Sequence, residues 1–285
     1  MHALALLACT DQLVSELIVG VDVAADTTVG GPNDRLGASV ALHDVVAVAA
    51  PGKGTVIEGG IATDGPSSWV GYVDGQLARG GADALWIGEE EFPVTGARAY
   101  AVGTNEVFVA TAGTLYSYPS ATVFFEGKIT GVAVVDGRPV VRLDTAQGCV
   151  IRALDTATEY DLPCAAEGAL AVENGALCAG DPQVDDDEGA GVVGCDDGAT
   201  WVGERGDHLG RAIGGGYAMG SFNKWLVPAR ARAVPLGDGP VLALELGAEN
   251  QPHALAGDGE SLVIGAPYYP ASGMPSGAAF VVRLP

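Results

Sequence analysis

The feature that most constrains the fold of this chain is a pattern that recurs along it. The copies lie at residues 36–51, 209–228 and 262–282, and the first two open with a Leu-Gly pair. In each copy a short apolar run ends at a proline. The period is about 40 residues, which is typical of architectures whose small units stack because none can bury its apolar faces alone.

Each copy is predicted to consist of short β-strands. Its apolar runs are bounded by Gly, Pro or Asp, as strands commonly are. The chain carries 43 glycines and 16 prolines, and no sustained 3.6-residue apolar period indicates a helix. Sheets that stack side by side and close into a ring leave few exposed edges. The sequence therefore predicts an all-β fold, a β-propeller.

The repeat resembles that of a known family. Leu-Gly at 36–37 and 209–210, with Ala49-Ala50-Pro51 and Gly265-Ala266-Pro267, is similar to the FG-GAP repeat of the integrin α-chain N-terminal-like propellers. The resemblance implies a ring that typically has seven blades. A length of 285 residues and a period of about 40 also give seven. Six blades is the alternative, because the pieces 74–96 and 97–126 are short for four strands each.

The repeat also divides the chain. The predicted blades are 31–73, 74–96, 97–126, 127–163, 164–205, 206–248 and 249–285. A second similarity, between residues 64–71 and 197–203, precedes a new repeat in each case. An apolar segment at 16–21 is expected to pair beside residues 279–282, so that strands from both ends close the ring. The predicted organisation is a signal remnant at 1–9, a tether at 10–15 and a single propeller domain at 16–285.

The first residues indicate export. Leu6-Leu7-Ala8-Cys9 resembles the lipobox of a bacterial lipoprotein, in which the cysteine sulfur carries a lipid. The apolar segment is shorter than in most signals and lacks a basic start, so a chance cysteine is the alternative. We expect a lipid on Cys9 to be the only membrane contact, and a bacterial cell-envelope or extracellular location.

The four remaining cysteines, Cys149, Cys164, Cys178 and Cys195, are predicted to form disulfides. Four cysteines allow three pairings, and sequence alone does not decide among them. Pairing of neighbours, Cys149 with Cys164 and Cys178 with Cys195, is favoured because each pair would link adjacent strands of one blade. A zinc site is the alternative, although no Cys-x-x-Cys spacing occurs.

Charge and loop motifs limit the partners. The net charge of −22 disfavours nucleic acid, because phosphates would be repelled. The calcium loop that many FG-GAP repeats carry is missing here. No cofactor is therefore predicted, although calcium is possible. Asp185 and Asp187, in an acidic cluster, are the candidate metal ligands. Tyr268 and Tyr269 are the candidate ligand-binding pair, because exposed aromatics can stack on a sugar ring or contact a protein.

Two functions follow from these features. The absence of a nucleophile elbow, a metalloprotease motif or a phosphate loop favours a binding or scaffold module for a protein or glycan at the cell envelope. The alternative is a hydrolase or lyase with its site in the central channel. That alternative requires titratable groups from several blades, such as His43, His208, Asp181 and Glu204, to converge there.

Overall fold

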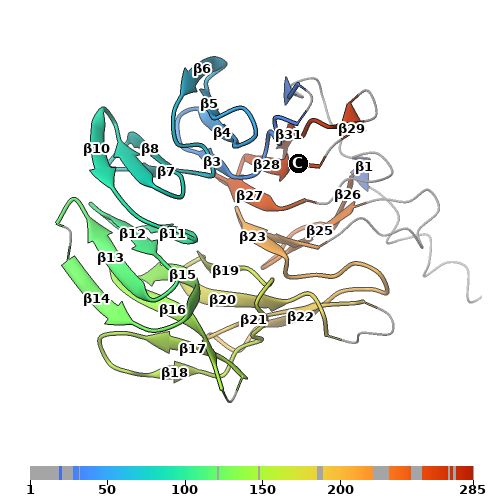
Figure 1. Ribbon diagram of the computed structural model, residues 1–285. Coiled ribbons are helices and arrows are strands. Elements are labelled where there is room, and N and C mark those ends of the chain that lie inside the picture. The colour runs from blue at the N-terminus through green and yellow to red at the C-terminus, as the bar shows by residue number, and fades with distance from the viewer. Residues whose placement is uncertain are drawn as a thin grey trace, which may run out of the picture.

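The chain folds into a seven-bladed β-propeller (Figure 1). The computed structural model describes residues 19–20, 28–31, 33–120, 122–146, 148–184, 189–220, 231–244, 252–268, 270–271 and 274–284. Seven sheets follow one another around a ring, and each contains four antiparallel strands. The predicted fold class and seven blades are confirmed, and the six-bladed alternative is wrong.

The first four blades each use four consecutive strands. Blade 1 contains β3 (Val40–Leu42), β4 (Val46–Ala50), β5 (Thr55–Glu58) and β6 (Ile61–Asp64). Blade 2 contains β7 (Trp69–Val73), β8 (Gln76–Gly80), β9 (Ala84–Ile87) and β10 (Glu90–Pro93). Blade 3 contains β11 (Ala99–Val102), β12 (Val107–Ala110), β13 (Thr114–Tyr118) and β14 (Thr122–Glu126). Blade 4 contains β15 (Ile129–Val135), β16 (Arg138–Thr145), β17 (Gly148–Ala153) and β18 (Glu159–Tyr160).

Blade 5 also uses four consecutive strands, whereas blades 6 and 7 each add a strand from the N-terminal part of the chain. Blade 5 contains β19 (Leu170–Glu173), β20 (Ala176–Asp181), β21 (Val192–Cys195) and β22 (Thr200–Val202). Blade 6 contains β23 (Ala212–Gly214), β24 (Tyr217–Met219), β25 (Ala231–Pro235) and β26 (Leu242–Leu244), with β1 (Val19–Gly20) beside β26. Blade 7 contains β27 (Ala254–Gly257), β28 (Ser261–Ala266), β31 (Ala278–Arg283) and β2 (Thr28–Val29). A small ribbon of β29 (Pro270–Ala271) and β30 (Met274–Pro275) lies between β28 and β31 in the chain.

The first strand of each blade lies on the inside of the ring. Each of these strands contacts the first strand of the next blade, and β27 contacts β3 to complete the circle. Residues at the start of all seven first strands line one cavity. Their starts therefore lie at one end of the channel, which we call the entry face.

The hydrophobic core is divided among the junctions between blades. The described residues form seven apolar clusters, and each combines side chains from two neighbouring blades. Leu36 and Val48 of blade 1, for example, pack with Val263 of blade 7. No blade buries its faces alone, as expected of a repeat architecture.

Tight turns allow the blades to be built from few residues. Asp74-Gly75, Asp136-Gly137 and Asn174-Gly175 each join the first strand of a blade to the second. Both residues of each pair have positive φ, between 49° and 83°. This is the type I′ geometry whose twist matches that of the flanking strands, and Asn-Gly and Asp-Gly favour it.

The repeated glycines lie where neighbouring blades meet. A Cβ on Gly265 would be 2.2 Å from the carbonyl oxygen of Gly37, and one on Gly180 would be 2.1 Å from that of Gly210. The preceding Leu36 and Leu209 are each 1% exposed. The Leu-Gly element of one blade therefore packs against a glycine in the second strand of the preceding blade. This is the close approach for which only glycine leaves room.

Strands from both ends close the ring, as predicted, but the N-terminal strand is a different one. Thr28 and Val29 pair with Ala279 and Ala278 on the outer side of blade 7. Within the predicted segment 16–21, Val19 and Gly20 pair instead with β26 of blade 6, in parallel. Each of these strands is two residues long, too short for its composition to specify which blade it joins.

One predicted blade boundary is wrong. The boundary at residue 73 assigned Trp69–Val73 to blade 1, whereas this strand is the first strand of blade 2. Blade 2 is therefore not too short for four strands. The similarity to residues 197–203 was misleading, because Thr200–Val202 is the outermost strand of blade 5.

Candidate functional site

At the entry face, described residues of all seven blades line one cavity. Its volume is about 420 Å³, and it is lined by one or more residues from each blade, among them Ser39, Trp69, Tyr100, Thr130, Leu170, Arg211 and His253. Ligand sites commonly occupy cavities of about 300 to 1,000 Å³. The described lining includes Arg142 and Arg211 but no carboxylate.

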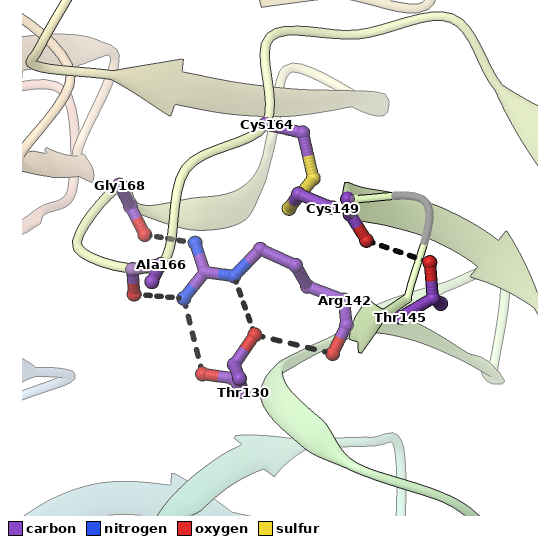
Figure 2. Close-up of a disulfide and its surroundings, with 8 residues drawn as sticks. Thr130, Arg142, Thr145, Cys149, Cys164, Ala166 and Gly168 are labelled. Carbon is purple, nitrogen blue, oxygen red and sulfur yellow. Dashed lines mark hydrogen bonds between the residues drawn. A yellow bond between two sulfur atoms is a disulfide. The ribbon is translucent and has the colours of Figure 1, made fainter.

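Arg142 of β16 reaches the cavity from the second strand of blade 4 and is almost completely buried. Its guanidinium donates from Nε to Thr130 Oγ1 at 3.0 Å, and from Nη2 to the carbonyl oxygens of Thr130 and Ala166 at 3.0 Å each. Nη1 donates to the carbonyl oxygen of Gly168. Figure 2 shows this fan of contacts beside the Cys149–Cys164 disulfide. All four acceptors are neutral oxygens, and burial lowers the pKa of Arg142 from its usual value.

The segment that enters blade 5 is fixed from two sides. The Cys149–Cys164 disulfide ties it to β17, and Arg142 holds the carbonyl groups of Ala166 and Gly168. Gly168 packs so closely on the second strand of blade 5 that a Cβ would lie 1.8 Å from the carbonyl oxygen of Gly180. These constraints hold the backbone at residue 167 next to the cavity.

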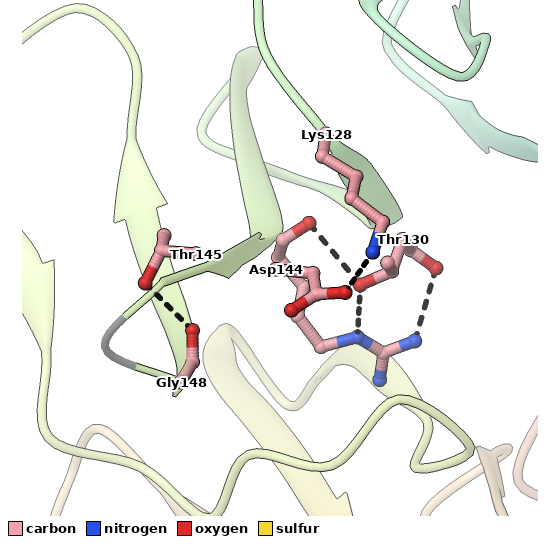
Figure 3. Close-up of polar contacts among 6 residues, drawn as sticks. Lys128, Thr130, Asp144, Thr145 and Gly148 are labelled. Carbon is pink, nitrogen blue, oxygen red and sulfur yellow. Dashed lines mark hydrogen bonds and ion pairs between the residues drawn. The ribbon is translucent and has the colours of Figure 1, made fainter.

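Near this segment, a separate ion pair lies where β15 of blade 4 begins and β16 ends. Figure 3 shows Lys128 bonded to Asp144, next to Thr130. Both side chains are exposed, at 61% and 46%. The charge of Lys128 is thus balanced at the surface.

An ion pair and an imidazole lie together on the blade 5 to blade 7 side of the cavity. Arg211 Nη2 lies 3.2 Å from Glu167 Oε2, with the arginine side chain 22% exposed and the glutamate 60%. His253 precedes β27 and lies close enough for both charges to shift the pKa of its imidazole. Burial lowers the pKa of His253, the positive charge of Arg211 lowers it further, and the negative charge of Glu167 opposes this. The imidazole is therefore neutral at neutral pH.

The environment of His253 leaves one ring nitrogen without a partner. Its backbone N–H donates to the carbonyl oxygen of Gly265 at 2.9 Å. Nε2 is buried, and it has no hydrogen-bond partner among the described residues. The ring lies edge-on to that of Tyr268, with centroids 5.3 Å apart.

Tyr268, one of the two predicted ligand-binding tyrosines, follows β28 at the entry face and is 46% exposed. Because β28 runs antiparallel to β27, its end lies beside the start of β27 at the rim of the cavity. The structure thus brings Tyr268, His253 and Arg211 together. Tyr269 lies outside the described residues.

The set of residues considered for an enzyme does not converge. His43 lies in the turn after β3, at the end of the ring opposite the entry face, and its side chain is 48% exposed. His208 Nδ1 lies 3.1 Å from the carbonyl oxygen of Pro182, and Glu204 pairs with Arg232 at 2.8 Å. None of these side chains, nor that of Asp181, lines the cavity.

Both predicted disulfides are present. Cys178 and Cys195 face each other directly across β20 and β21 of blade 5. Cys149 and Cys164 are also bonded, but they link the third strand of blade 4 to the segment entering blade 5 rather than two strands of one blade.

The other predicted site residues lie outside the described part of the chain. These are the lipidation site Cys9 and the candidate metal ligands Asp185 and Asp187. Within the ranges that the structure describes, no group of three or more His, Cys, Asp or Glu side chains is arranged to hold a metal ion. Those ranges also contain no helix long and apolar enough to cross a bilayer.

A second cavity, of about 630 Å³, lies at the opposite end of the ring among the turns of blades 5 to 7. Its carboxylates are Glu173, Asp238 and Asp258. Glu173 accepts a hydrogen bond from the Gly216 N–H at 2.7 Å, and burial raises the pKa of its carboxyl. Glu173 thus stabilises the turn of a neighbouring blade, whereas the entry face combines cationic, neutral and aromatic groups.

Comparison with known proteins identifies the fold but no family. No family model matches the chain, and no curated protein sequence matches it. A catalytically inactive histidine-to-alanine variant of virginiamycin B lyase from Staphylococcus aureus, solved with quinupristin, is similar over 90% of this chain and 99% of its own, with TM-score 0.61 and 10% identity.

Two further solved structures have the same architecture. Hydrazine synthase of Kuenenia stuttgartiensis matches 94% of this chain and 99% of its own, with TM-score 0.58 and 12% identity. PorZ, a surface component of the type-IX secretion system of Porphyromonas gingivalis, matches 92% of this chain and 39% of its own, with TM-score 0.57 and 11% identity. These proteins have unrelated roles, so the likeness establishes the propeller alone.

Proposed function

We propose that this chain is a binding module that takes a protein or glycan partner of the bacterial cell envelope at its entry face. The observation that carries the proposal is the cavity to which all seven blades contribute, with Arg211 and His253 in its wall and the exposed Tyr268 at its rim. A few polar groups that converge on a preformed hollow are the usual basis of specific binding.

Co-sedimentation with bacterial envelope fractions tests this proposal. We expect the wild-type protein to sediment with a cell-wall or outer-polysaccharide fraction, and Tyr268→Ala and Arg211→Gln to lose most of that binding. Ile61→Ala is the control, because Ile61 is 73% exposed on the outer strand of blade 1, away from the cavity. Equal binding by all variants, or none by the wild type, would contradict the proposal.

A hydrolase or lyase site in the channel is the second candidate. One observation favours it: a neutral imidazole beside an Arg–Glu ion pair has the components of general acid–base chemistry. The similarity to a lyase that a histidine replacement inactivates agrees with this idea. Under this candidate, His253→Gln should abolish turnover of an envelope polymer. Intact polymer after incubation with the wild type would oppose it.

An envelope location supports both candidates. Disulfides persist mainly in extracytoplasmic compartments, and the similar PorZ is a bacterial surface component. We propose lipid anchoring through Cys9 and membership of the FG-GAP family on the sequence features given above. Intact mass spectrometry of the protein from a bacterial host should give a lipid-modified Cys9, and reduction should add the mass of four hydrogens. An unmodified protein that retains Met1 would refute the anchor.

A further inference from the structure

We propose that the entry-face site binds an acidic sugar, with Arg211 holding the carboxylate of a uronate residue and Tyr268 packing on its ring. This inference rests on the binding function proposed above and specifies the chemistry of the ligand. Three features of the site carry it: its charge, the exposed partner of Arg211, and the aromatic rim.

The cavity is cationic within a strongly acidic protein. The chain has 36 acidic and 14 basic side chains, yet the described lining of the cavity contains two arginines and no carboxylate. The buried guanidinium of Arg142 is bonded only to neutral oxygens, so its charge is not cancelled nearby. Positive charge in the wall of a cavity attracts anions to it.

Glu167 occupies the position that a ligand carboxylate would take. Arg211 is mostly buried, whereas its partner Glu167 is 60% exposed at the end of a flexible side chain. An exposed ion pair of this kind contributes little stability, about 0 to 1 kcal/mol. A ligand carboxylate can therefore replace Glu167 at low cost and use the planar donor geometry of arginine.

The rim adds features that suit a sugar ring. Tyr268 is 46% exposed and in contact with His253, so it is held in place and accessible. Aromatic faces bind the apolar faces of other rings. A neutral imidazole such as that of His253 can exchange hydrogen bonds with a hydroxyl group without repelling it. A hydroxylated ring that carries a carboxylate is a ligand that can contact Arg211, His253 and Tyr268 together.

Isothermal titration calorimetry with glucuronate, glucuronamide and succinate tests the inference. Glucuronamide keeps the ring and removes the charge, whereas succinate keeps carboxylates and removes the ring. We expect glucuronate to bind at least about tenfold more tightly than either, because a charge-assisted hydrogen bond contributes about 1.5–3 kcal/mol. Arg211→Gln should weaken glucuronate binding at least about tenfold, and Tyr268→Ala should weaken it as well.

Two matched variants sharpen the test. Glu167→Gln should tighten binding about two- to fivefold, because it removes the internal competitor of the ligand. Arg152→Gln should leave binding unchanged, because Arg152 pairs with Glu159 on the outer strands of blade 4. If Arg211→Gln does not fold, Arg211→Lys keeps the charge but loses the planar donor pair, and it should still weaken binding.

The inference is overturned if glucuronate does not bind, if Arg211→Gln binds it as well as the wild type, or if Glu167→Gln weakens binding. Succinate binding as tight as that of glucuronate would also overturn it, because a site without preference for the ring is not a sugar site. If glucuronate fails while Tyr268→Ala and Arg211→Gln still lose envelope co-sedimentation, the sugar chemistry is wrong and the proposed binding function stands.

Discussion

Gly37 and Gly54 both have positive φ angles, but only Gly37 lies against another blade. Their φ angles are 86° and 70°. A Cβ on Gly37 would lie 2.3 Å from the carbonyl oxygen of Ala278 and 2.8 Å from the N–H nitrogen of Ala266, whereas a Cβ on Gly54 would meet no atom within 4 Å. Comparing the same substitution at both positions therefore separates the free-energy cost of a left-handed backbone from that of crowding a blade junction.

Substitution by alanine should give different losses at the two positions. We expect Gly54→Ala to lower the free energy of unfolding by about 1–2 kcal/mol, the cost of the backbone conformation. Gly37→Ala should cost more than about 3 kcal/mol, because the strands of blades 1 and 7 must also move apart. Guanidinium chloride unfolding followed by circular dichroism measures both values. Equal losses would mean that the junction accommodates a methyl group.

The buried imidazole of His253 should make stability depend on pH. Burial lowers the pKa of His253 below its usual 6.5, so the unfolded chain binds the proton first as pH falls. The free energy of unfolding should therefore decrease as pH falls through about 6.5 toward the lower pKa of the folded state.

Comparison with His253→Gln isolates this effect, because every other titrating group is common to both proteins. The stability of the wild type relative to the variant should fall between about pH 7.5 and pH 5.5 in urea unfolding. A difference that does not change with pH would show that the imidazole titrates as it does in water.

At the scale of elements, the two disulfides differ in what they position. They span 15 and 17 residues, so loop entropy predicts a similar stabilisation of about 3 kcal/mol for each. Cys178–Cys195 links two strands that already pair through their backbones. Cys149–Cys164 instead links β17 to the segment that carries Glu167, and this segment lies next to the cavity.

Removal of each disulfide should separate stability from binding. We expect the double variants Cys149→Ser/Cys164→Ser and Cys178→Ser/Cys195→Ser to lose similar free energies of unfolding. Only the first should change the affinity for an entry-face ligand, as measured by calorimetry on the folded proteins. A comparable change in the second variant would show that the site responds to general loosening of blade 5.

The elements also show what sequence could predict. Short strands, glycine turns and the Leu-Gly junctions follow from local chemistry, so the fold class and the repeat were predictable. Trp-Val-Gly occurs both in the innermost strand β7 and at the end of the outermost strand β22. The residue pattern of a strand shows which of its faces are buried, but not how far the strand lies from the propeller axis. This explains the misplaced boundary at residue 73.

The site was predictable only in part. The exposure of Tyr268 was predictable because Tyr268 follows Gly265-Ala266-Pro267 in a loop, and the neighbour pairing of the cysteines was correct. Arg142, Glu167 and Arg211 were missed, because the starts of separate blades assemble the cavity and no local motif encodes it. One signal was available: Arg211 directly follows a Leu-Gly pair and therefore had to lie at the start of a first strand.

At the scale of the whole molecule, a two-residue strand covers the outer edge of the last blade. Deletion of residues 1–31 would remove β2 and expose the edge of β31. We expect this variant to unfold at a lower temperature and to be cleaved faster by protease near residues 278–283. Deletion of residues 1–18, which keeps β1 and β2, is the control and should have little effect. Equal stability of the two variants would show that blade 7 closes the ring without β2.

The pairing of β2 with β31 also imposes an order on the formation of the molecule. Val29 pairs with Ala278, so the growing chain makes β2 long before it makes the strand that β2 pairs with. Contacts between such distant residues form slowly and leave apolar edges open in the meantime. The edge of blade 7 therefore stays unpaired, and open to association with other chains, until residues 278–283 have been made.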